Sequence, residues 1–361
     1  MIPLRIRASM EAALPPFVVR LNADWVPERS RDDAFLECAH GDTLTFDTSR
    51  GKLILHGLSL SESVGDVLLV IPQRHIAHRL IRAASTHNTL VATERCDQLC
   101  VMCSQPPKEH HTDWFSYFTA ASLLAPQGAC IGISGGEPTL YKEELFALFG
   151  AVQKERPDVS FHVLSNGQHF EERDIPQLRQ CASQVQWGIP LYSHSADTHD
   201  GIVAKAGAFA ELMESFGVLL RSAANIELRT VVMKENVRDL PALGHFTASH
   251  LPFVRQWSLM QLERIGYAKK NWQALFFDHS TDFDALGRAI SIATLNGLNP
   301  RLYNFPLCTV PEQYRELAPV SISDWKRRYL AVCEGCALRS SCTGVFEWYD
   351  SNVGFERIGS A

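Results

Sequence analysis

Residues 93–107 read TERCDQLCVMCSQPP, a stretch in which Cys96, Cys100 and Cys103 have the spacing C-x3-C-x2-C. A β-like run at 89–93 precedes them and predicts a strand that ends just before the first cysteine. Three thiolates at this spacing can hold one cubane iron–sulfur cluster, which normally takes four thiolates, so that one iron stays open for another ligand. Zinc is the alternative metal, although zinc sites more usually present C-x2-C pairs. The spacing therefore favours an iron–sulfur cluster with an open position.

Strands and helices are expected to alternate downstream of these cysteines. The expected strands lie at 89–93, 130–134, 161–164, 185–191, 226–233 and 254–262, and the expected helices at 112–124, 143–154, 209–220, 240–250, 283–295 and 323–332. Such alternation predicts an α/β fold with a parallel sheet, either open or as a partial (β/α)6 TIM-like barrel. We expect three domains: a small, partly β N-terminal accessory domain at 1–87 with strands at 52–56 and 67–71, a core at 88–300, and an extension at 301–361.

Two further motifs follow the second and third expected strands. They are Gly135-Gly136-Glu137-Pro138 and Ser165-Asn166-Gly167. The carboxyl ends of parallel strands meet on one face, where ligands of α/β folds bind. The cysteine triplet and both motifs are therefore expected to converge on one ligand site.

Composition narrows the class of protein. The chain has 361 residues, 46% of them hydrophobic, and a formal net charge of −6. These values favour a folded protein over a disordered one and disfavour a strongly basic nucleic-acid binder. No secretory signal or run of about 20 apolar residues is apparent. We therefore expect a cytoplasmic protein that binds neither nucleic acid nor membrane, and clustered cysteines in a reducing compartment indicate metal binding or catalysis.

The cysteine triplet followed by Gly-Gly-Glu-Pro resembles the radical S-adenosylmethionine (radical SAM) superfamily over about residues 88–300. The resemblance implies that Cys96, Cys100 and Cys103 hold three irons of a [4Fe–4S] cluster and that SAM chelates the fourth. Reductive cleavage of SAM would then give a 5′-deoxyadenosyl radical that abstracts hydrogen from a substrate. An electron donor of flavodoxin or ferredoxin type is implied. The cofactors would supply the difficult chemistry while the protein orients them. No individual catalytic residue is identified.

The same resemblance implies a set of SAM-binding residues. It assigns the glycine pair to close approach of the backbone to SAM, Ser165 and Asn166 to contacts with the ribose or carboxyl group, and Met260 to backbone contact with adenine. The implied SAM contacts are Gly135, Gly136, Glu137, Pro138, Ser165, Asn166 and Met260. For Ser165 and Asn166 a simple Asn-Gly turn is an equal alternative.

Some positions depart from the family pattern. Many members have an aromatic residue before the third cysteine, where this chain has Met102. Peptide-modifying members often have an arginine that reaches the SAM carboxylate. This chain has Val203 at the matching position, and Lys205 is a candidate replacement for that cation. His199 and Asp200 are expected to serve local capping and turn structure rather than catalysis.

A second group of cysteines lies near the end of the sequence. It comprises Cys308, Cys333, Cys336 and Cys342. Four thiolates suffice for a closed [4Fe–4S] cluster or a structural zinc, and unligated thiols are a third reading. The arrangement resembles the one-cluster "twitch" relative of the SPASM extension in peptide-modifying radical SAM enzymes, which implies an auxiliary [4Fe–4S] cluster. The remaining Cys38, Cys130 and Cys181 are expected to pack as small hydrophobic residues.

Residues 93–107 also resemble a narrower group, the C-type maturases of the His-Xaa-Ser peptide systems, in which Met102 and the Ser-Gln-Pro-Pro after Cys103 both fit. This implies a His-Xaa-Ser repeat precursor peptide as substrate and a companion radical SAM maturase. The N-terminal domain is a candidate leader-peptide binder by strand addition. A radical SAM enzyme acting on a folded protein or small metabolite, as sulfatase maturases act on a protein, is one alternative, and a zinc-stabilised binding module is another.

Overall fold

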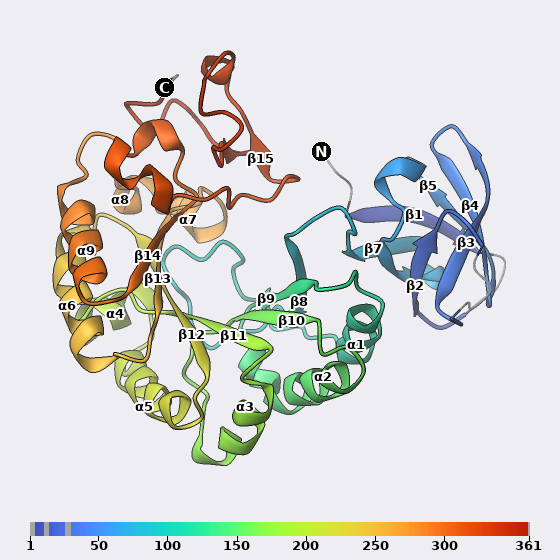
Figure 1. Cartoon of the computed structure of the whole chain (residues 1–361), viewed down its shortest axis with the longest axis horizontal. Helices are drawn as coiled ribbons and strands as arrows, with labels where there is room; N and C mark the ends of the chain where they lie inside the picture. Colours follow the sequence, from blue (N-terminus) through green and yellow to red (C-terminus); the bar gives the residue numbers. More distant parts are fainter. Residues whose placement is uncertain (1–3, 11–13, 26–29, 360–361) are drawn as a thin grey trace. The chain divides into compact units, whose positions relative to one another are not determined.

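The computed structural model describes residues 4–10, 14–25 and 30–359 (Figure 1). The chain forms two compact units, each composed of several segments. The first comprises 1–92, 112–134 and 141–162, and the second comprises 93–111, 135–140 and 163–361. The second unit therefore contains both cysteine groups and both of the motifs that follow expected strands.

Seven strands of the first unit form a closed barrel in the order β1-β5-β4-β3-β2-β6-β7. Their bounds are β1 Arg5–Met10, β2 Phe17–Asn22, β3 Asp33–His40, β4 Thr43–Thr48, β5 Gly51–His56, β6 Val67–Ile71 and β7 Ile76–Ile81. The expected strands at 52–56 and 67–71 are confirmed. Alternate residues such as Phe46, Leu53 and Leu55 point inward and are fully buried, as the two-residue period of a strand requires.

Closure of this barrel changes one expectation. β1 pairs with β7 as well as with β5, all antiparallel, so the ring has no terminal strand among its described residues. A closed barrel removes the unpaired sheet edge that strand addition needs. Capture of a leader peptide by strand addition to this sheet is therefore not favoured by the structure.

Seven further strands form one sheet in the order β14-β13-β12-β11-β10-β9-β8. Their bounds are β8 Asn88–Thr93, β9 Cys130–Gly135, β10 Ser160–Leu164, β11 Val185–Pro190, β12 Asn225–Val232, β13 Gln256–Gln261 and β14 Asn299–Tyr303. The registers from β11 through β14 are parallel. All six expected strands are present, which confirms an α/β fold with a parallel sheet, and β14 is an additional seventh.

The helices follow the predicted alternation with several additions. They are α1 Phe115–Leu123, α2 Lys142–Glu155, α3 Ile175–Cys181, α4 Ala196–Val203, α5 Ala208–Arg221, α6 Leu240–His250, α7 Gly266–Lys270, α8 Trp272–Leu275 and α9 Asp284–Leu295. Five expected helices are confirmed as α1, α2, α5, α6 and α9, and α3, α4, α7 and α8 were not expected. Within the described residues, no helix has the length and apolar character needed to cross a membrane.

One local expectation is wrong. The helix expected at 323–332 does not form, because Arg327–Arg328 is the short strand β15, paired with β16 (Val345–Phe346), and a single 3-10 turn follows.

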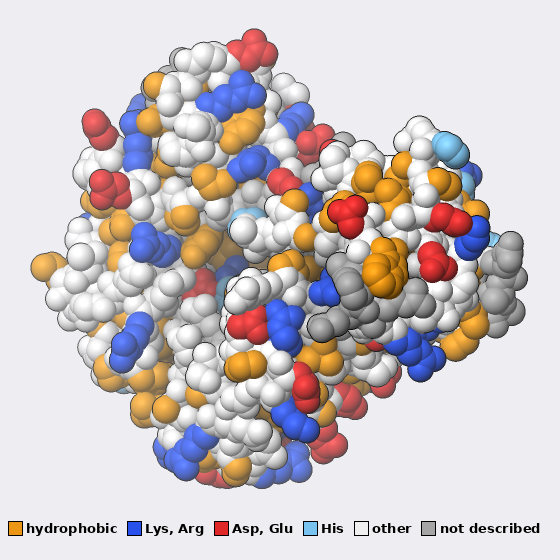
Figure 2. All heavy atoms as spheres, turned by 45° about the vertical axis from the view of Figure 1, so that its right-hand side comes forward, with side chains coloured by type: hydrophobic (Ala, Val, Ile, Leu, Met, Phe, Trp, Pro, Cys, Tyr) orange, Lys and Arg blue, Asp and Glu red, His pale blue; other side chains and the backbone are white. Residues whose placement is uncertain are grey.

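The molecular surface carries mixed charge. Figure 2 shows Lys and Arg side chains interspersed with Asp and Glu side chains on the visible face rather than gathered in one basic patch. This distribution accords with the net charge of −6.

Candidate active site

The loop that carries the cysteine triplet is held by α4. The backbone N–H of Leu99 donates to the carbonyl of Val203 at 3.2 Å, and that of Val101 donates to Ile202 at 2.9 Å. Both acceptors belong to the last turn of α4, whose final carbonyls have no partner within the helix. The end of α4 therefore fixes the first part of the cysteine loop.

The segment after β13 fixes the other side of the loop. The N–H of Tyr267 donates to the carbonyl of Cys103 at 2.8 Å, and the Asn271 side chain donates to Val101 at 2.8 Å. Gly266 has φ of +58°, and a Cβ there would lie 2.4 Å from the Cys103 carbonyl oxygen. Only glycine satisfies both conditions without strain.

Burial raises the pKa of each thiol in the triplet, to about 12 for Cys96 and for Cys100, with Cys103 also raised. Negative charge on Cys103 raises the pKa of the other two further. Thiolates grouped in this way are costly unless a cation is present, and metal coordination lowers a thiol pKa. The donor set therefore fits an iron–sulfur cluster bound through thiolates. Among the described residues, no three His, Cys, Asp or Glu side chains surround a position for a single metal ion.

The two glycines of Gly-Gly-Glu-Pro are required by the chain's own backbone. A Cβ on Gly135, where φ is +133°, would lie 2.1 Å from the Thr93 carbonyl oxygen, and one on Gly136 would lie 2.0 Å from that of Arg95. The N–H of Gly136 and that of Glu137 donate to these same two carbonyls, each at 2.7 Å. The glycines thus let the end of β9 pair with the start of the cysteine loop.

Glu137 organises the ends of two neighbouring strands. Its carboxylate is fully buried and accepts from the N–H and hydroxyl of Thr139 at 2.8 and 2.6 Å, from the Ser165 hydroxyl at 2.8 Å and from the N–H of Asn166. Burial raises the pKa of this carboxyl, while the hydrogen bonds oppose the rise. The resemblance implies that Glu137 and Ser165 contact SAM. In the structure, the Ser165 hydroxyl instead donates a hydrogen bond to the Glu137 carboxylate.

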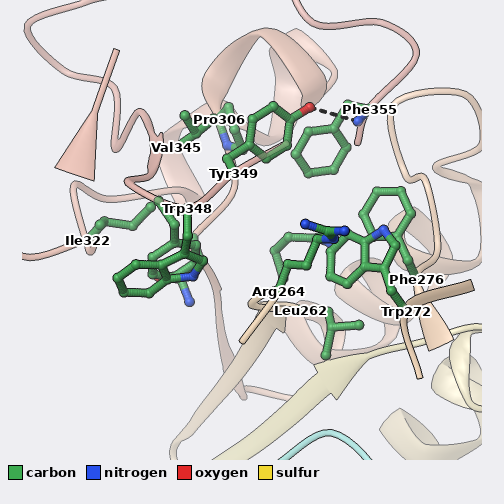
Figure 3. A pocket seen from close by; sticks show the side chains of 13 residues that line it. Leu262, Arg264, Trp272, Phe276, Pro306, Ile322, Val345, Trp348, Tyr349 and Phe355 are labelled. Atoms are coloured by element: carbon green, nitrogen blue, oxygen red, sulfur yellow. Dashed lines mark hydrogen bonds between the residues drawn. The ribbon is translucent and has the colours of Figure 1, made fainter. Parts of the chain in front are cut away.

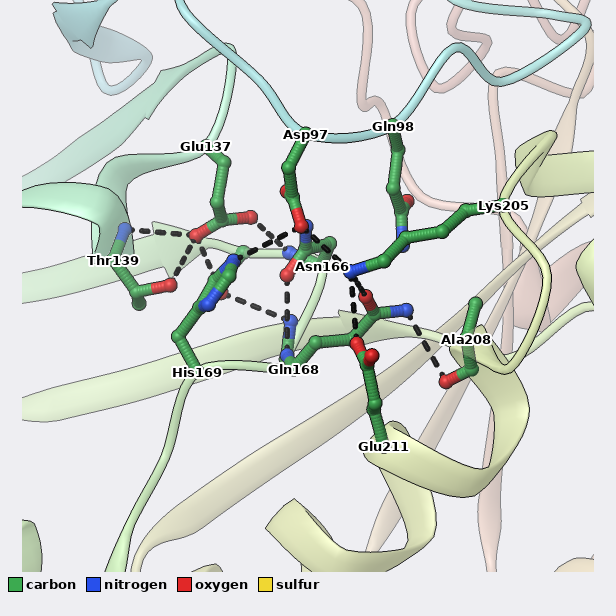
Figure 4. Close-up of polar contacts among 12 residues, drawn as sticks. Asp97, Gln98, Glu137, Thr139, Asn166, Gln168, His169, Lys205, Ala208 and Glu211 are labelled. Carbon is green, nitrogen blue, oxygen red and sulfur yellow. Dashed lines mark hydrogen bonds and ion pairs between the residues drawn. The ribbon is translucent and has the colours of Figure 1, made fainter.

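Figure 4 shows how the residue after the first cysteine joins this network. The Asp97 carboxylate accepts from the Asn166 amide at 2.8 Å and from the Lys205 ammonium at 2.8 Å, and it lies 3.3 Å from the His169 imidazole. Burial opposes ionisation of Asp97, but the hydrogen bonds from His169 and Lys205 outweigh it and hold its pKa well below the ordinary value. The cysteine loop is thereby tied to the residues after β10.

Lys205 is fully engaged within the chain. Its ammonium lies 2.8 Å from each of three acceptors, on Asp97, Gln168 and Glu211. An ammonium has three donors, so none remains for the carboxylate of SAM in this arrangement. The substitution of Lys205 for the family arginine is therefore not favoured, and Lys205 acts as a positioning residue for Asp97.

The chain matches one family model, the radical SAM superfamily, across residues 90–246. This segment, which is less than half of the chain, is similar to the radical SAM superfamily. The matched segment begins within β8 and includes the triplet, the Gly-Gly-Glu-Pro motif and Lys205. A comparison with curated protein sequences gives no match.

Several solved structures are similar to the chain. SuiB of Streptococcus suis bound to its precursor peptide SuiA is 13% identical, with 62% of this chain and 49% of SuiB covered and a TM-score of 0.49. The protein anSMEcpe with bound AdoMet is 15% identical, with coverage of 58% and 62% and a TM-score of 0.47. A radical SAM methyltransferase from Sphaerobacter thermophilus is 13% identical, with coverage of 73% and 74% and a TM-score of 0.45. The chain spans about half the length of SuiB.

His199 and Asp200 of the radical SAM segment have the structural roles expected of them. The Asp200 carboxylate accepts from the N–H of Gly207 at 2.6 Å and of Phe209 at 2.7 Å, which caps the start of α5. The buried His199 imidazole accepts from the N–H of Tyr192 at 3.4 Å, and burial lowers its pKa to about 4.

A charged cluster on β12 and β13 was not expected from the sequence. Glu227 is buried and lies 3.1 Å from the Arg229 guanidinium, and it also accepts from the Ser258 hydroxyl. Arg229 lies 3.0 Å from the sulfur of Met260, the residue assigned to adenine by the resemblance. The signal was available, because two charges two residues apart in a strand share one face.

The structure brings the C-terminal cysteines into one neighbourhood. Burial raises the pKa of Cys308, and negative charge on Cys342 and Cys333 raises it further. The Cys342 sulfur accepts from the N–H of Leu307 at 3.4 Å and of Gly344 at 3.3 Å. Cys336 follows in a turn, its N–H 3.3 Å from the Cys333 carbonyl.

The three isolated cysteines differ from one another. Cys181 is buried at the end of α3, as a packing role requires, but Cys38 and Cys130 are exposed. The packing prediction is therefore wrong for Cys38 and Cys130. Cys38 follows a β-bulge in β3, where the outer half of the strand is exposed, and Cys130 is the first residue of β9.

Proposed function

We propose that the chain is a radical SAM enzyme that modifies a ribosomally made peptide. The observation that carries the proposal is the group of three mutually interacting thiols on a loop anchored at both sides, within a segment of this superfamily. When bound, a [4Fe–4S] cluster with SAM supplies a carbon radical that abstracts hydrogen from the substrate. The sheet that presents the loop is proposed to form a partial TIM-like barrel.

The chain's own residues perform the positioning. Cys96, Cys100 and Cys103 would hold the cluster, and the tethers from α4 and Tyr267 keep the loop in one shape. The pairing of Gly136 with Thr93 holds the half-buried glycine pair next to the start of the cysteine loop, which supports the expected backbone contact with SAM.

Substitution of the triplet tests this proposal. The chain reconstituted anaerobically with iron and sulfide should cleave SAM reductively, and Cys96→Ala, Cys100→Ala and Cys103→Ala should each abolish cleavage. Cys38→Ala is the matched control, because Cys38 is exposed and distant in sequence. Cleavage retained in any triplet variant would overturn the assignment.

The second cysteine group is proposed to hold an auxiliary [4Fe–4S] cluster. The raised pKa of Cys308 and the two N–H donors to Cys342 support it, since backbone N–H groups commonly stabilise cluster sulfurs. Iron analysis should give about eight irons per chain in the wild type and about four after Cys308→Ala. Stoichiometric zinc at this group would contradict the proposal.

The substrate is proposed to be a His-Xaa-Ser repeat precursor peptide, with a companion radical SAM maturase and a flavodoxin- or ferredoxin-type electron donor. The resemblance of residues 93–107 supports this proposal. Coexpression with such a peptide should alter its mass or, for an isomerisation, its fragmentation and hydrolysis products. An unchanged peptide together with active SAM cleavage would favour a folded protein or a small metabolite as substrate.

A further inference from the structure

The side chain of Tyr192 packs against the cysteine loop. Tyr192 follows the carboxyl end of β11, the end of a parallel strand at which ligands of α/β folds bind. It is buried in one apolar cluster with Met102, the residue before Cys103, and Cys100 is partly buried against the same cluster. The Tyr192 ring therefore lies in the immediate surroundings of the candidate cluster ligands, although neither the motifs nor the resemblance assigned it a role.

Neighbouring residues hold Tyr192 in place. Its backbone carbonyl accepts from the Asn236 side chain at 3.1 Å, and its backbone N–H donates to the His199 imidazole at 3.4 Å. The His199 ring also packs near the Tyr192 ring, with centroids 5.7 Å apart. The same apolar cluster includes Trp272, which is stacked with Phe276 at 4.4 Å (Figure 3). Packing and backbone contacts therefore fix the position of the phenol.

The hydroxyl of Tyr192 is a free hydrogen-bond donor. Within residues 4–10, 14–25 and 30–359 it has no hydrogen-bond partner, because both side-chain contacts to Tyr192 involve its backbone. The residue keeps 8% of its surface accessible, and its oxygen is not one of the fully enclosed polar atoms that lack a partner. A largely buried hydroxyl without a partner is costly, so a group bound beside it would gain this hydrogen bond.

The charges around the phenol show where the hydroxyl lies. Burial raises the pKa of Tyr192 most, and negative charge on each of the three cysteines of the triplet raises it further. Such repulsion acts on the phenol oxygen and weakens with distance, so this oxygen is near all three sulfurs. Arg229 has the opposite effect on the phenol, but its guanidinium already contacts Glu227 and the sulfur of Met260. The phenol is thus an uncommitted donor beside the triplet.

We propose that the Tyr192 phenol donates its O–H to a sulfur of the iron–sulfur cluster held by the triplet and thereby raises the reduction potential of that cluster. Hydrogen bonds to the sulfurs are among the factors that set the potential of such clusters. Reduction adds one electron, and a hydrogen bond is stronger to the more negatively charged form, so the donor favours the reduced state. This inference rests on the proposed function for the cluster itself, but it requires neither SAM nor a peptide.

A redox titration of the reconstituted full-length protein without SAM, followed by electron paramagnetic resonance of the reduced clusters, tests the proposal. The signal of the triplet cluster is the one that is lost when Cys96, Cys100 and Cys103 are all replaced by Ala. Tyr192→Phe keeps the ring and removes the hydroxyl. Because one hydrogen bond to a charged group is lost, the cluster should become about tenfold harder to reduce, a shift of about 59 mV to lower potential for one electron.

Tyr303→Phe is the matched control. The Tyr303 phenol also has its pKa raised, by burial first and by the charge on Glu227 second, but it contacts the Gln256 side chain at 3.4 Å. Its removal should leave the potential of the triplet cluster unchanged. Electron–nuclear double resonance of the reduced cluster gives a second readout, because Tyr192→Phe should lose one exchangeable-proton coupling that the wild type and Tyr303→Phe retain.

The possible outcomes separate this inference from the proposed function. Iron content equal to that of the wild type establishes that Tyr192→Phe folds and holds its clusters. With the clusters present, an unchanged potential in Tyr192→Phe, or an equal shift in Tyr303→Phe, would overturn the inference and leave the proposed function standing. The absence of any cluster signal that depends on the triplet would instead count against the proposed function and, with it, against this inference.

Discussion

Gly136 shows how one missing side chain shapes the candidate site. Its position leaves 2.0 Å between a built Cβ and the Arg95 carbonyl oxygen, far inside normal contact. By contrast, a Cβ on Gly150, in the middle of α2, meets nothing within 4 Å. Glycine is therefore required at position 136, where two backbone segments approach closely. At position 150 no packing contact requires it.

Alanine at these two positions should have opposite effects. Gly136→Ala should separate the end of β9 from the cysteine loop, lowering the iron content after reconstitution and the free energy of unfolding. Gly150→Ala should raise the free energy of unfolding by about 0.5–1 kcal/mol, since alanine is the better helix former. Iron analysis and urea unfolding measure the two quantities. Full iron content in Gly136→Ala would contradict the close approach.

His279 should make stability depend on pH. The unfolded chain protonates this imidazole as the pH falls through about 6.5, whereas burial keeps it neutral in the folded chain down to about pH 3. The unfolded state binds more protons in that window, so stability falls as the pH is lowered, by up to about 1.4 kcal/mol per unit from this group. Urea unfolding of wild type and His279→Gln between pH 7 and about 4 measures the slope. Equal slopes would show that His279 is not held neutral.

At the scale of elements, the regular parts of the core were predictable. Strands such as β9 and helices such as α9 have clear apolar periodicity, and their expected bounds differ from the observed ones by at most one residue. β14 was not predicted, because Pro300 and Arg301 interrupt its apolar run and its strand state depends on pairing with β13. The short helices α7 and α8 flank Asn271 in the segment that contacts the cysteine loop, where tertiary contacts outweigh local propensity.

The sequence predicted which cysteines are the candidate ligands, but not the ion pairs and hydrogen bonds that connect the site. The spacing of the cysteine triplet favoured an iron–sulfur cluster over zinc, and the Gly-Gly-Glu-Pro motif strengthened that prediction. The Asp97 and Lys205 ion pair joins residues 108 positions apart, and no local pattern encodes such a pair. The helix expected at 323–332 failed for the same reason, because Arg327 and Arg328 pair with a strand that follows the last cysteine.

At the scale of the whole molecule, the N-terminal barrel contains a buried ion pair. Asp66 and Arg79 have side chains that are 1% and 0% exposed, and the Arg79 Nε–H donates to Asp66 at 2.7 Å. Removal of one partner from such a pair leaves an uncompensated charge, which costs about 3–5 kcal/mol. The pair therefore makes the barrel sensitive to single substitutions.

Arg79→Met should lower the free energy of unfolding by about 3–5 kcal/mol, and Asp66→Leu combined with it should restore part of the loss. Lys52→Met is the control, because the ion pair of Lys52 with Glu37 is exposed and should contribute less than about 1 kcal/mol. Chemical unfolding followed by circular dichroism measures all three. If the double variant is less stable than Arg79→Met, the loss of stability in Arg79→Met does not come from an unpaired charge on Asp66.

The tether from Asn271 to Val101 has a consequence for biosynthesis. The two residues are 170 positions apart in the sequence. Bringing them together costs more conformational entropy than forming local contacts, so this contact forms more slowly. A nascent chain that has not yet emerged beyond residue 271 lacks this support for the cysteine loop. Insertion of the cluster is therefore expected to be a late, post-translational event, and fragments that end before Asn271 should acquire little iron even though all three ligands are present.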